Sequence, residues 1–406
     1  MNLNSTTGLL FFLALKGFRQ HLFSSLVAAF SIALAGGLLL STLKIQKQTQ
    51  TSFNNASGGF DAVLGARGSK LQLILNALFH LDASPGNLSW EQYELIKNTP
   101  GVKEAYPIAV GDNYLGYRLV GTDPELFHKH EWKEGEKYKL RRGRVFSEMA
   151  KEALVGSFVA ERLNLKIGDR FQPYHGLNFK EDTQHEDVYV VVGLLEATGT
   201  PSDKVIWIPI KGIQLMEGHD AEMAQSVSAV LLSLKGAAGF NLELKYNRRG
   251  NQATLAWPVA ATLASFFEKM NWFRGVLQVI AYIIACVGIL MVASTMRSSM
   301  NERKRDFAIL RSLGASRWVV TGVILGHALI ISLLGALGSL LIMQGIALVT
   351  QQIIVEQTGV LLGGMSLQLV DLWVFGGVVV TGLLGGLWSA VSAYRTNLAS
   401  NLQPTS

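Results

Sequence analysis

The stretch Leu22–Leu43, LFSSLVAAFSIALAGGLLLSTL, contains no charged residue. Its 22 residues exceed the roughly 20 apolar residues with which an α-helix crosses the hydrocarbon core of a membrane. Three later stretches are free of charge in the same way: Val276–Met296, Val319–Val349 and Leu372–Ala393. The sequence therefore predicts a membrane protein with four transmembrane α-helices, one before and three after a long hydrophilic segment.

The composition of the chain also favours a membrane protein. Of its 406 residues, 49% are hydrophobic and 16% are charged, whereas charged residues make up about 25% of average soluble domains. A cleaved signal peptide is the alternative for the first stretch, because Lys16 and Arg19 precede it. The length of the stretch argues against this alternative, since the apolar part of a signal peptide is about 7–15 residues long.

Basic residues next to the apolar stretches predict the orientation of the chain, because Lys and Arg near a transmembrane helix stay in the cytoplasm. Nine of the 36 basic residues lie before the first stretch, in the loop Arg297–Trp318 or in the C-terminal tail, and the loop Thr350–Asp371 contains none. Both termini are therefore predicted to be cytoplasmic, and the formal net charge of +6 reflects this topology. No basic patch or motif indicates that the chain binds nucleic acid.

The predicted segments alternate between cytoplasm, membrane and exterior. In order, they are a cytoplasmic or interfacial N-terminal helix (1–21), the first transmembrane helix (22–43), an extracytoplasmic domain (44–275), the second transmembrane helix (276–296), a cytoplasmic loop (297–318), the third transmembrane helix (319–349), an extracytoplasmic loop (350–371), the fourth transmembrane helix (372–393) and a cytoplasmic tail (394–406). The apolar run Leu9–Phe18 suits a helix lying along the inner leaflet. Its alternative is an extension of the first transmembrane helix.

The large extracytoplasmic segment is predicted to fold as a mixed α/β domain. Runs rich in Val, Ile and Leu and bounded by Gly, Pro and Asp predict strands at Tyr114–Gly121, Ala153–Val155, Asp187–Leu195, Lys204–Ile210 and Val227–Leu234. Helices are predicted at Leu71–Leu81, Trp90–Lys97 and Phe158–Leu165. A capping box of Ser89 and Gln92 starts the second of these helices.

Two further features concern the boundaries of this domain. The charge-dense segment Lys129–Arg144 predicts an exposed loop, and Pro258 is predicted to open a helix that leads directly into the second transmembrane helix. The single cysteine, Cys286, lies inside that transmembrane helix. The domain therefore has no internal disulfide and depends on its own core.

Small residues recur at every fourth position of the first and last transmembrane helices. They are Ala29, Ala33, Gly37 and Ser41 in the first helix, and Gly377, Thr381, Gly385 and Ser389 in the last. Gly322 and Gly326 repeat the spacing in the third helix. At this interval small side chains line one face of a helix and let another backbone approach closely, so we expect these faces to pack helices together. The alternative is the general abundance of Gly in membrane helices.

The cytoplasmic loop contains the sequence MNERKRDFAILRSLGASR (Met300–Arg317). It predicts a short amphipathic helix with a charged start at Glu302–Asp306 and an apolar face. The residues of that face are Phe307, Leu310 and Leu313. Gly314 is a good helix end, and Ser316 is a good start for the next helix. Basic residues that merely fix the topology are the alternative interpretation.

The order of residues in NERKRDFAILRSLGAS resembles the signature of the FtsX/MacB-type (LolC/LolE-like) family of ABC transporter permeases. In that signature an acid-Arg-x-x-acid pattern is followed by Ile-Leu-Arg, by Leu-Gly-Ala and then by a membrane helix. Three other segments are similar to the outer domain and first helix of the family: ALVGSFVAERLNLKIGDRF (153–171), VVVGLLEATGTPSDKVIWIPI (190–210) and LALKGFRQHLFSSLVAAFSIALAGG (13–37). The order of one helix, a large outer domain and three helices is also that of the family.

The resemblance implies a function and a set of partners. The loop would contact a separate ABC ATPase subunit and transmit its motion through Glu302, Arg303, Lys304, Arg305, Asp306, Phe307, Leu310, Arg311, Leu313 and Gly314. A second permease chain, identical or homologous, would complete the assembly in the lipid bilayer, with a periplasmic adaptor or substrate-binding protein as a further partner. Relatives extrude peptides or amphiphilic drugs, extract lipoproteins or activate cell-wall hydrolases.

Motifs for catalysis, cofactors and metals are absent from the sequence. No Gly-x-x-x-x-Gly-Lys-Ser/Thr loop occurs, and GARGSK (Gly65–Lys70) lacks the spacing that cradles phosphates. The histidines outside the membrane stretches, among them His128, His130, His175, His185 and His219, are scattered, so neither a metal site nor a cofactor is predicted. His327 replaces a Glu that the family often carries and is either functional or structural. A receptor or signalling protein and a membrane-anchored enzyme are the alternative functions.

Overall fold

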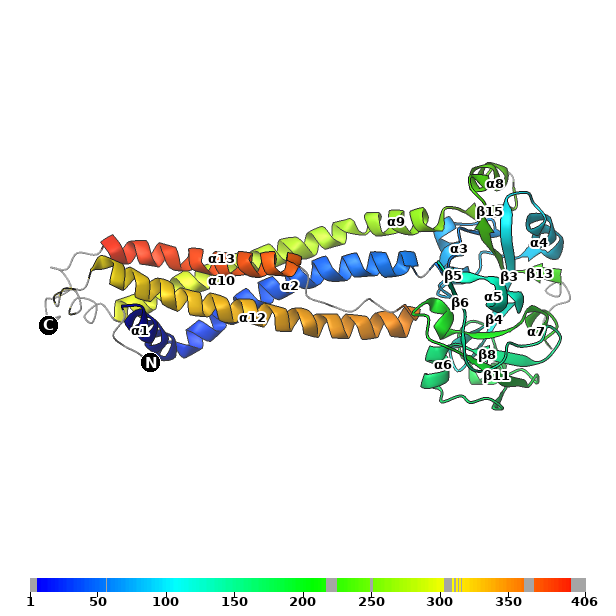
Figure 1. Cartoon of the computed structure of the whole chain (residues 1–406), viewed down its shortest axis with the longest axis horizontal. Coiled ribbons are helices and arrows are strands. Elements are labelled where there is room, and N and C mark those ends of the chain that lie inside the picture. Colours follow the sequence, from blue (N-terminus) through cyan, green and yellow to red (C-terminus); the bar gives the residue numbers. More distant parts are fainter. Residues whose placement is uncertain are drawn as a thin grey trace. The chain divides into compact units, whose positions relative to one another are not determined.

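Long helices form where the sequence is apolar (Figure 1). They are α2 (Leu22–Asn55), α10 (Asn271–Glu302), α12 (Arg317–Thr358) and α13 (Leu369–Arg395), preceded by the shorter α1 (Thr6–Gln20). The computed structural model describes residues 6–55, 57–216, 225–248, 251–302, 309, 312, 314, 316–360 and 369–395. Among these residues, Leu22–Ile45, Val259–Ser299 and Trp318–Thr358 are helical stretches long and apolar enough to cross a membrane, and Asp371–Leu387 is a shorter apolar one.

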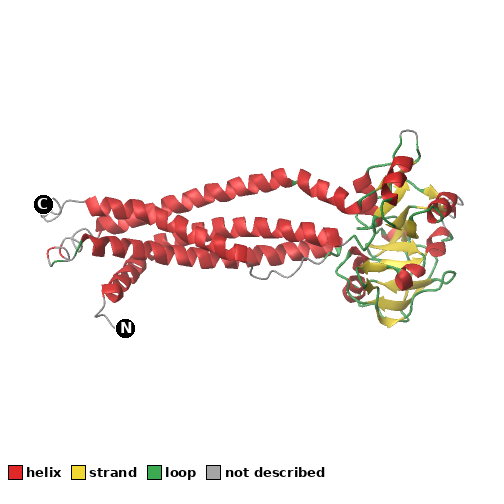
Figure 2. Cartoon of the chain, turned by 45° about the horizontal axis from the view of Figure 1, so that its top comes forward, coloured by secondary structure: helices red, strands yellow, loops and turns green. Residues whose placement is uncertain are grey.

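The chain divides into two units, which we name the membrane unit and the outer unit. The membrane unit comprises Met1–Lys47, Asn271–Thr350 and Gly364–Ser406, and the outer unit comprises Gln48–Met270 and Gln351–Gly363. All strands of the described residues belong to the outer unit, whereas the membrane unit is helical (Figure 2). The predicted class, a membrane protein with one helix before and three after a large mixed α/β domain, is confirmed.

The outer unit is built on one mixed sheet of eleven strands in the order β15-β1-β14-β3-β4-β12-β8-β11-β7, with β10 beside β3 and β9 beside β11. Its strands are β1 (Ala62–Ala66), β3 (Val102–Tyr114), β4 (Tyr117–Thr122), β7 (Leu140–Gly143), β8 (Glu152–Val155), β9 (Arg170–Phe171), β10 (Tyr174–His175), β11 (Tyr189–Leu195), β12 (Ile206–Pro209), β14 (Ala229–Leu234) and β15 (Ala253–Ala256). Short separate pairs are formed by β2 (Leu88–Ser89) with β13 (Ser226–Val227) and by β5 (Glu131–Lys133) with β6 (Glu136–Lys137).

Short helices cover this sheet. They are α3 (Lys70–Ala77), α4 (Trp90–Lys97), α5 (Glu125–Lys129), α6 (Ser157–Arg162), α7 (Ile210–Gln214), α8 (Ala238–Tyr246) and α9 (Val259–Lys269), with 3-10 turns η1 (Glu181–Thr183) and η2 (Pro201–Lys204). The predicted capping box of α4 is confirmed, because Ser89 Oγ accepts a hydrogen bond from the Gln92 amide while the Gln92 side chain accepts one from the Ser89 amide. Met270, with a right-handed helical backbone, is the single residue between α9 and α10, so the helical run predicted from Pro258 continues through it into the apolar stretch.

Strand β3 joins the two halves of the sheet. Its first part pairs with β14, where Ile108 faces Ala229, and its second part pairs with β4, where Ala109 faces Gly121. The register with β4 shifts between Val110 and Asn113. Because a bulge bends a strand and increases its twist, this long strand can serve both halves.

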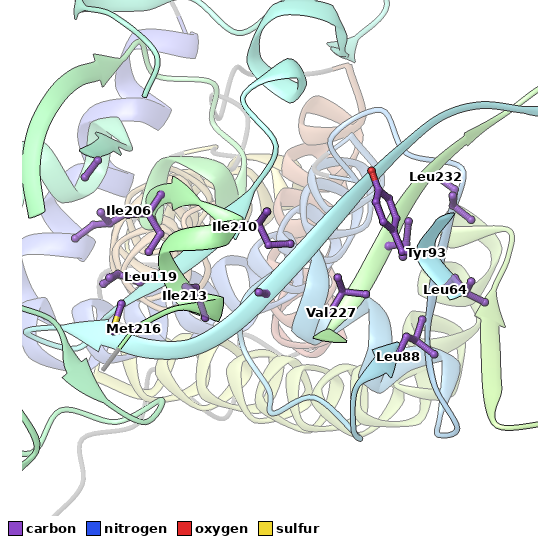
Figure 3. Close-up of a cluster of buried hydrophobic side chains, with 14 of the residues drawn as sticks. Leu64, Leu88, Tyr93, Leu119, Ile206, Ile210, Ile213, Met216, Val227 and Leu232 are labelled. Atoms are coloured by element: carbon purple, nitrogen blue, oxygen red, sulfur yellow. The ribbon is translucent and has the colours of Figure 1, made fainter. Parts of the chain in front are cut away.

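Both faces of the sheet are buried. One apolar cluster includes Leu64, Leu119, Ile206 and Leu232 together with Tyr93 of α4 (Figure 3). A second cluster contains the alternate residues of the same strands, among them Val63, Val120, Trp207 and Leu231. Strands that are covered on both faces are apolar at nearly every position, which explains why β12 and β14 are readable as runs of Val, Ile and Leu.

The prediction that Lys129–Arg144 forms an exposed loop is partly wrong. It contains the β5–β6 hairpin and the edge strand β7, and His130 at its start is 2% exposed. The His130 ring stacks on Phe60 with centroids 3.9 Å apart, and its Nε2 lies 2.6 Å from the Gly58 carbonyl oxygen. The charged side chains of the hairpin face solvent. His130, through Gly58 and Phe60, packs against the segment that follows α2. His128 is exposed on α5.

His80 is buried beside Trp207 in the outer unit. Its ring meets that of Trp207 edge-on at a centroid distance of 5.7 Å, and among the described residues its Nδ1 has no hydrogen-bond partner. Burial, with a smaller contribution from the positive charge of Arg118, lowers the pKa of His80 from 6.5 to about 3. The folded protein therefore keeps His80 neutral at pH values where the unfolded chain protonates it.

We expect the outer unit to lose stability as the pH falls from 6.5 towards 3, because over this range the unfolded state binds a proton at residue 80 and the folded state does not. The loss should be about 3 kcal/mol at pH 4.5. His80→Asn, whose side chain tolerates the positive φ of 54° at this position, should reduce this pH dependence, whereas His128→Asn should not. Hydrogen exchange of the sheet in the solubilised chain at pH 7 and 4.5 measures this, and an equally steep loss in His80→Asn would contradict it.

Candidate coupling site and helix contacts

Of the ten predicted coupling residues, the structure describes Glu302 and Gly314. Glu302 is the last residue of α10, and α12 begins at Arg317. Between them, Gly314 has a φ of +96°, the left-handed conformation with which Gly commonly ends a helix. The remaining predicted coupling residues, Arg303, Lys304, Arg305, Asp306, Phe307, Leu310, Arg311 and Leu313, lie outside the described residues.

Glu302 contacts the turn between α1 and α2. Its Oε2 lies 3.4 Å from Nε2 of His21, a distance that allows a charge interaction when His21 is protonated but is long for a hydrogen bond. His21 is the single residue between α1 and α2. The start of the coupling loop is therefore next to the N-terminal helix, which the sequence did not reveal.

Helix α1 packs on the beginning of α12. A Cβ placed on Gly322 would lie 3.3 Å from Leu10 Cδ1, and one on Gly326 would lie 3.1 Å from the Ala14 Cβ. One turn further, the ring of Phe18 meets that of His327 edge-on, with centroids 6.1 Å apart. The predicted spacing of Gly322 and Gly326 thus coincides with the α1 contact.

His327 is buried and hydrogen-bonded inside the membrane unit. Its Nε2 lies 3.1 Å from Ser25 Oγ on α2, and the residue is 3% exposed. A neutral imidazole with a hydrogen-bond partner and an aromatic neighbour is a stable arrangement in a bundle core. These contacts favour the structural interpretation of His327 over the functional one.

The small residues of α2 lie against α12 over several turns. A Cβ on Gly335 would lie 2.6 Å from Ile32 Cγ2 and 3.1 Å from the Ala29 carbonyl oxygen, and a Cβ on Gly338 would lie 2.8 Å from that of Ala33. On the other side of the contact, a Cβ on Gly37 would lie 2.6 Å from a methyl group of Ile342. Ser41 is 3% exposed and donates a hydrogen bond to the Gly37 carbonyl. The two backbones are therefore too close for larger side chains.

In α13 the close contacts involve Gly382, Gly385 and Gly386. A Cβ on Gly385 would lie 2.8 Å from the Ile289 carbonyl oxygen of α10, and Cβ atoms on Gly382 and Gly386 would collide with Ser332 and Ala328 of α12. Of the other predicted positions in α13, Gly377 has no atom of the described chain within 4 Å of a Cβ. Thr381 is half-buried and bonds to its own helix, and the Ser389 side chain is not described.

An apolar cavity of about 260 Å³ lies between α2, α10 and α13. Gly36, Leu39, Ala281, Ile289, Gly377 and Thr381 are among its lining residues. The residues around it that face outward are large and apolar, such as Tyr282 at 60% exposed and Trp373 at 81%. This side of the membrane unit is suited to contact with lipid or with another apolar helix.

A buried ion pair joins α2 to α13. Lys44 Nζ lies 2.7 Å from Asp371 Oδ2, and both side chains are less than one-tenth exposed. Each residue stands at the end of an apolar stretch, so sequence reasoning treated both as boundary markers. The signal that could have revealed the pair is that the two opposite charges stand at the predicted outer ends of two helices.

The end of α12 belongs to the outer unit. Val360, just after α12, is fully buried in the second apolar cluster of the sheet. Lys204 of η2 donates a hydrogen bond of 2.6 Å to the Gln357 carbonyl oxygen, and Arg162 of α6 lies 3.6 Å from Glu356. Burial lowers the pKa of Lys204. The chain that leaves α12 therefore enters the core of the outer unit at Val360.

The α2–α12 contact predicts different outcomes for two glycines of the same helix. We expect Gly335→Ala to lower the thermal unfolding temperature of the solubilised chain, because the added methyl group meets Ile32 and overpacking costs about 1–3 kcal/mol. Gly345→Ala is the matched control, since a Cβ there meets nothing within 4 Å in the described chain and Ala favours a helix. Equal unfolding temperatures for the two variants would contradict the close contact.

Two family models match the chain. The one described as the MacB-like periplasmic core domain matches residues 25–240, more than half of the chain, and the one described as the FtsX-like permease C-terminal matches residues 278–398. The crystal structure of the periplasmic region of MacB from Actinobacillus actinomycetemcomitans is 12% identical with a TM-score of 0.34, and the match covers 52% of this chain and 94% of that one.

The extracellular domain of the noncanonic ABC-type transporter YknZ from Gram-positive bacteria is 16% identical with a TM-score of 0.29, and the match covers 48% of this chain and 97% of that one. The two family models follow one another along the chain and cover most of the outer domain and the last helices. The chain belongs to the FtsX/MacB family of ABC transporter permeases.

Proposed function

We propose that the chain is the permease subunit of an ABC transporter and transmits the motion of a separate ATPase subunit to its extracytoplasmic domain. The observation that carries this proposal is the course of α12, which follows the predicted coupling loop and is continued, two residues after its end, by Val360 in the core of the outer unit. A helix is stiff along its axis because every turn is hydrogen-bonded. A displacement of the first turn of α12 therefore also displaces its last turn.

The ATPase would dock on the loop between α10 and α12, with both termini in the cytoplasm. The basic residues there, Arg303, Lys304 and Arg305, provide charge for an acidic surface, and Phe307, Leu310 and Leu313 provide an apolar face. Glu302 beside His21 would extend the motion to α1. ATP hydrolysis belongs to the partner in this proposal, because this sequence contains no phosphate-binding loop.

The substrate class is a peptide, a lipoprotein or another amphiphile, exported or extracted at the outer face. The polar groups inside the membrane unit support mechanical transmission over passage through the bundle. Lys44 and Asp371 are buried against each other, and His327 is buried against Ser25. Buried pairs of this kind leave little polar surface to line a path for a hydrophilic substrate.

A second permease chain would complete the assembly. The described helices expose large apolar side chains on α10 and α13, among them Ile283, Leu290, Leu372 and Val380. In a membrane such a surface can face lipid or pack on another helix. The second candidate function, a receptor that activates extracytoplasmic partners, would use the same α12 connection in the absence of transport.

The proposal predicts that charge reversal of the coupling loop releases the ATPase. In the variant Arg303→Glu, Lys304→Glu, Arg305→Glu, we expect copurification of the ATPase subunit from gently solubilised membranes to fall at least about tenfold, because like charges then face an acidic surface. The matched control reverses one Lys and two Arg that are exposed in the outer unit, Lys139, Arg141 and Arg142. Undiminished copurification with the loop variant would contradict the coupling role.

The buried end of α12 gives a second test. We expect Val360→Asp to abolish the ATP-dependent change in hydrogen exchange of the outer unit, because an unpaired carboxylate does not stay in an apolar core. The ATPase should still copurify with this variant. Val188→Asp is the control, since Val188 is 40% exposed in the same unit. An unchanged ATP response in Val360→Asp would show that α12 does not carry the motion.

A further inference from the structure

Three side chains that are far apart in the sequence meet at one edge of the outer unit. They are Asp112, His175 and His185, and one oxygen or nitrogen of each lies within 4.8 Å of the other two. Asp112 is near the end of β3 and His175 is directly opposite it on β10. His185 follows η1. In the sequence, His175 and His185 are two of several scattered histidines, and nothing there connects them with Asp112.

The distances between the donor atoms fit a metal ion. His185 Nε2 lies 3.2 Å and His175 Nδ1 lies 3.4 Å from Asp112 Oδ1. Ligands about 2.0–2.1 Å from a tetrahedral Zn²⁺ are roughly 3.4 Å from one another. The longer contact exceeds the usual range of an N–H···O hydrogen bond, about 2.7–3.2 Å. The centroids of the two histidine rings are 5.5 Å apart, and one nitrogen of each ring lies within 4.8 Å of the other and of an Asp112 oxygen.

The backbone around the three residues is held by hydrogen bonds. The His185 amide donates to the Pro173 carbonyl at 2.8 Å, and the Gln172 side chain donates to the His185 carbonyl at 3.2 Å. Thr183 Oγ1 donates to the His175 carbonyl at 3.2 Å. Ligands on a fixed backbone bind a metal with less loss of conformational freedom.

The exposure of the three residues also suits an ion that enters from solvent. The Asp112 side chain is fully buried and that of His185 is 7% exposed, whereas His175 is 54% exposed. A buried carboxylate provides the negative charge, and the exposed side leaves room for a water ligand. Two imidazoles and one carboxylate with an open position are typical of zinc and neighbouring transition metals, while Mg²⁺ and Ca²⁺ prefer oxygen ligands.

We propose that Asp112, His175 and His185 bind a divalent transition-metal ion of the zinc class. The ion would link the segment that follows β9, residues 172–187, to the end of β3. This inference does not depend on the proposed transport function, since the site lies within the outer unit. Its rival is a plain hydrogen bond from His185 to Asp112, which needs no metal.

The test is a calorimetric titration of the metal-free, detergent-solubilised full chain with Zn²⁺. We expect one saturable site per chain, and a loss of affinity of at least about a hundredfold in His175→Gln or His185→Gln, more than the outer-shell losses of about 10–100-fold. His128→Gln is the matched control, because it removes one exposed histidine that lies outside the cluster. In the wild type, Zn²⁺ should also slow hydrogen exchange in residues 172–187, and Mg²⁺ should not.

Two results would overturn the proposal. One is a wild-type chain without saturable one-to-one binding of Zn²⁺, which would leave the hydrogen bond as the whole interaction. The other is binding by both site variants that is as tight as binding by His128→Gln, which would place the ion elsewhere. His175→Gln keeps the test decisive if His185→Gln misfolds, because the His175 side chain is half-exposed.

Discussion

The membrane unit depends on the close approach of α2 and α12. Lipid is as apolar as the helix surfaces, so helices inside it associate through packing and hydrogen bonds and not through the hydrophobic effect. At Gly37, Gly335 and Gly338 a single added carbon would lie within 3 Å of the opposite helix, which means that the backbones themselves are in contact. Helix α12 uses further small residues to receive α1 and α13. It is therefore the shared partner of α1, α2 and α13, whereas α10 contacts α2 and α13.

Polar side chains inside the membrane unit connect its helices to one another. The described ionisable side chains inside the bundle are used for contacts between helices, as in Lys44 with Asp371. Removing one member of a buried pair costs about 3–5 kcal/mol because the other charge is left uncompensated, so Lys44 and Asp371 depend on each other.

The elements that could be predicted from the sequence are those that a local residue pattern determines. Charge-free stretches located the long helices, the Ser89–Gln92 capping box located α4, and runs such as that of β14 located the buried strands. Strand β3 was missed because Pro107, Gly111 and Asp112 interrupt its apolar residues, and Pro normally argues against a central strand. The α13 contacts at Gly382 and Gly386 and the meeting of Asp112 with two histidines depend on tertiary pairing. No spacing rule in one sequence encodes such pairing.

Strand pairing in the outer unit connects the contact with α12 to the site of Asp112 and His175. Lys204 of η2 holds the last turn of α12, and η2 leads directly into β12. Strand β12 is paired with β4, and β4 with the second half of β3, where Asp112 faces His175. Strands joined by hydrogen-bonded ladders shift together, because sliding one strand breaks its ladder on both sides. Under the proposed function, a displacement of α12 would reach the strand that carries Asp112, where the proposed metal ion would tie residues 172–187 to β3.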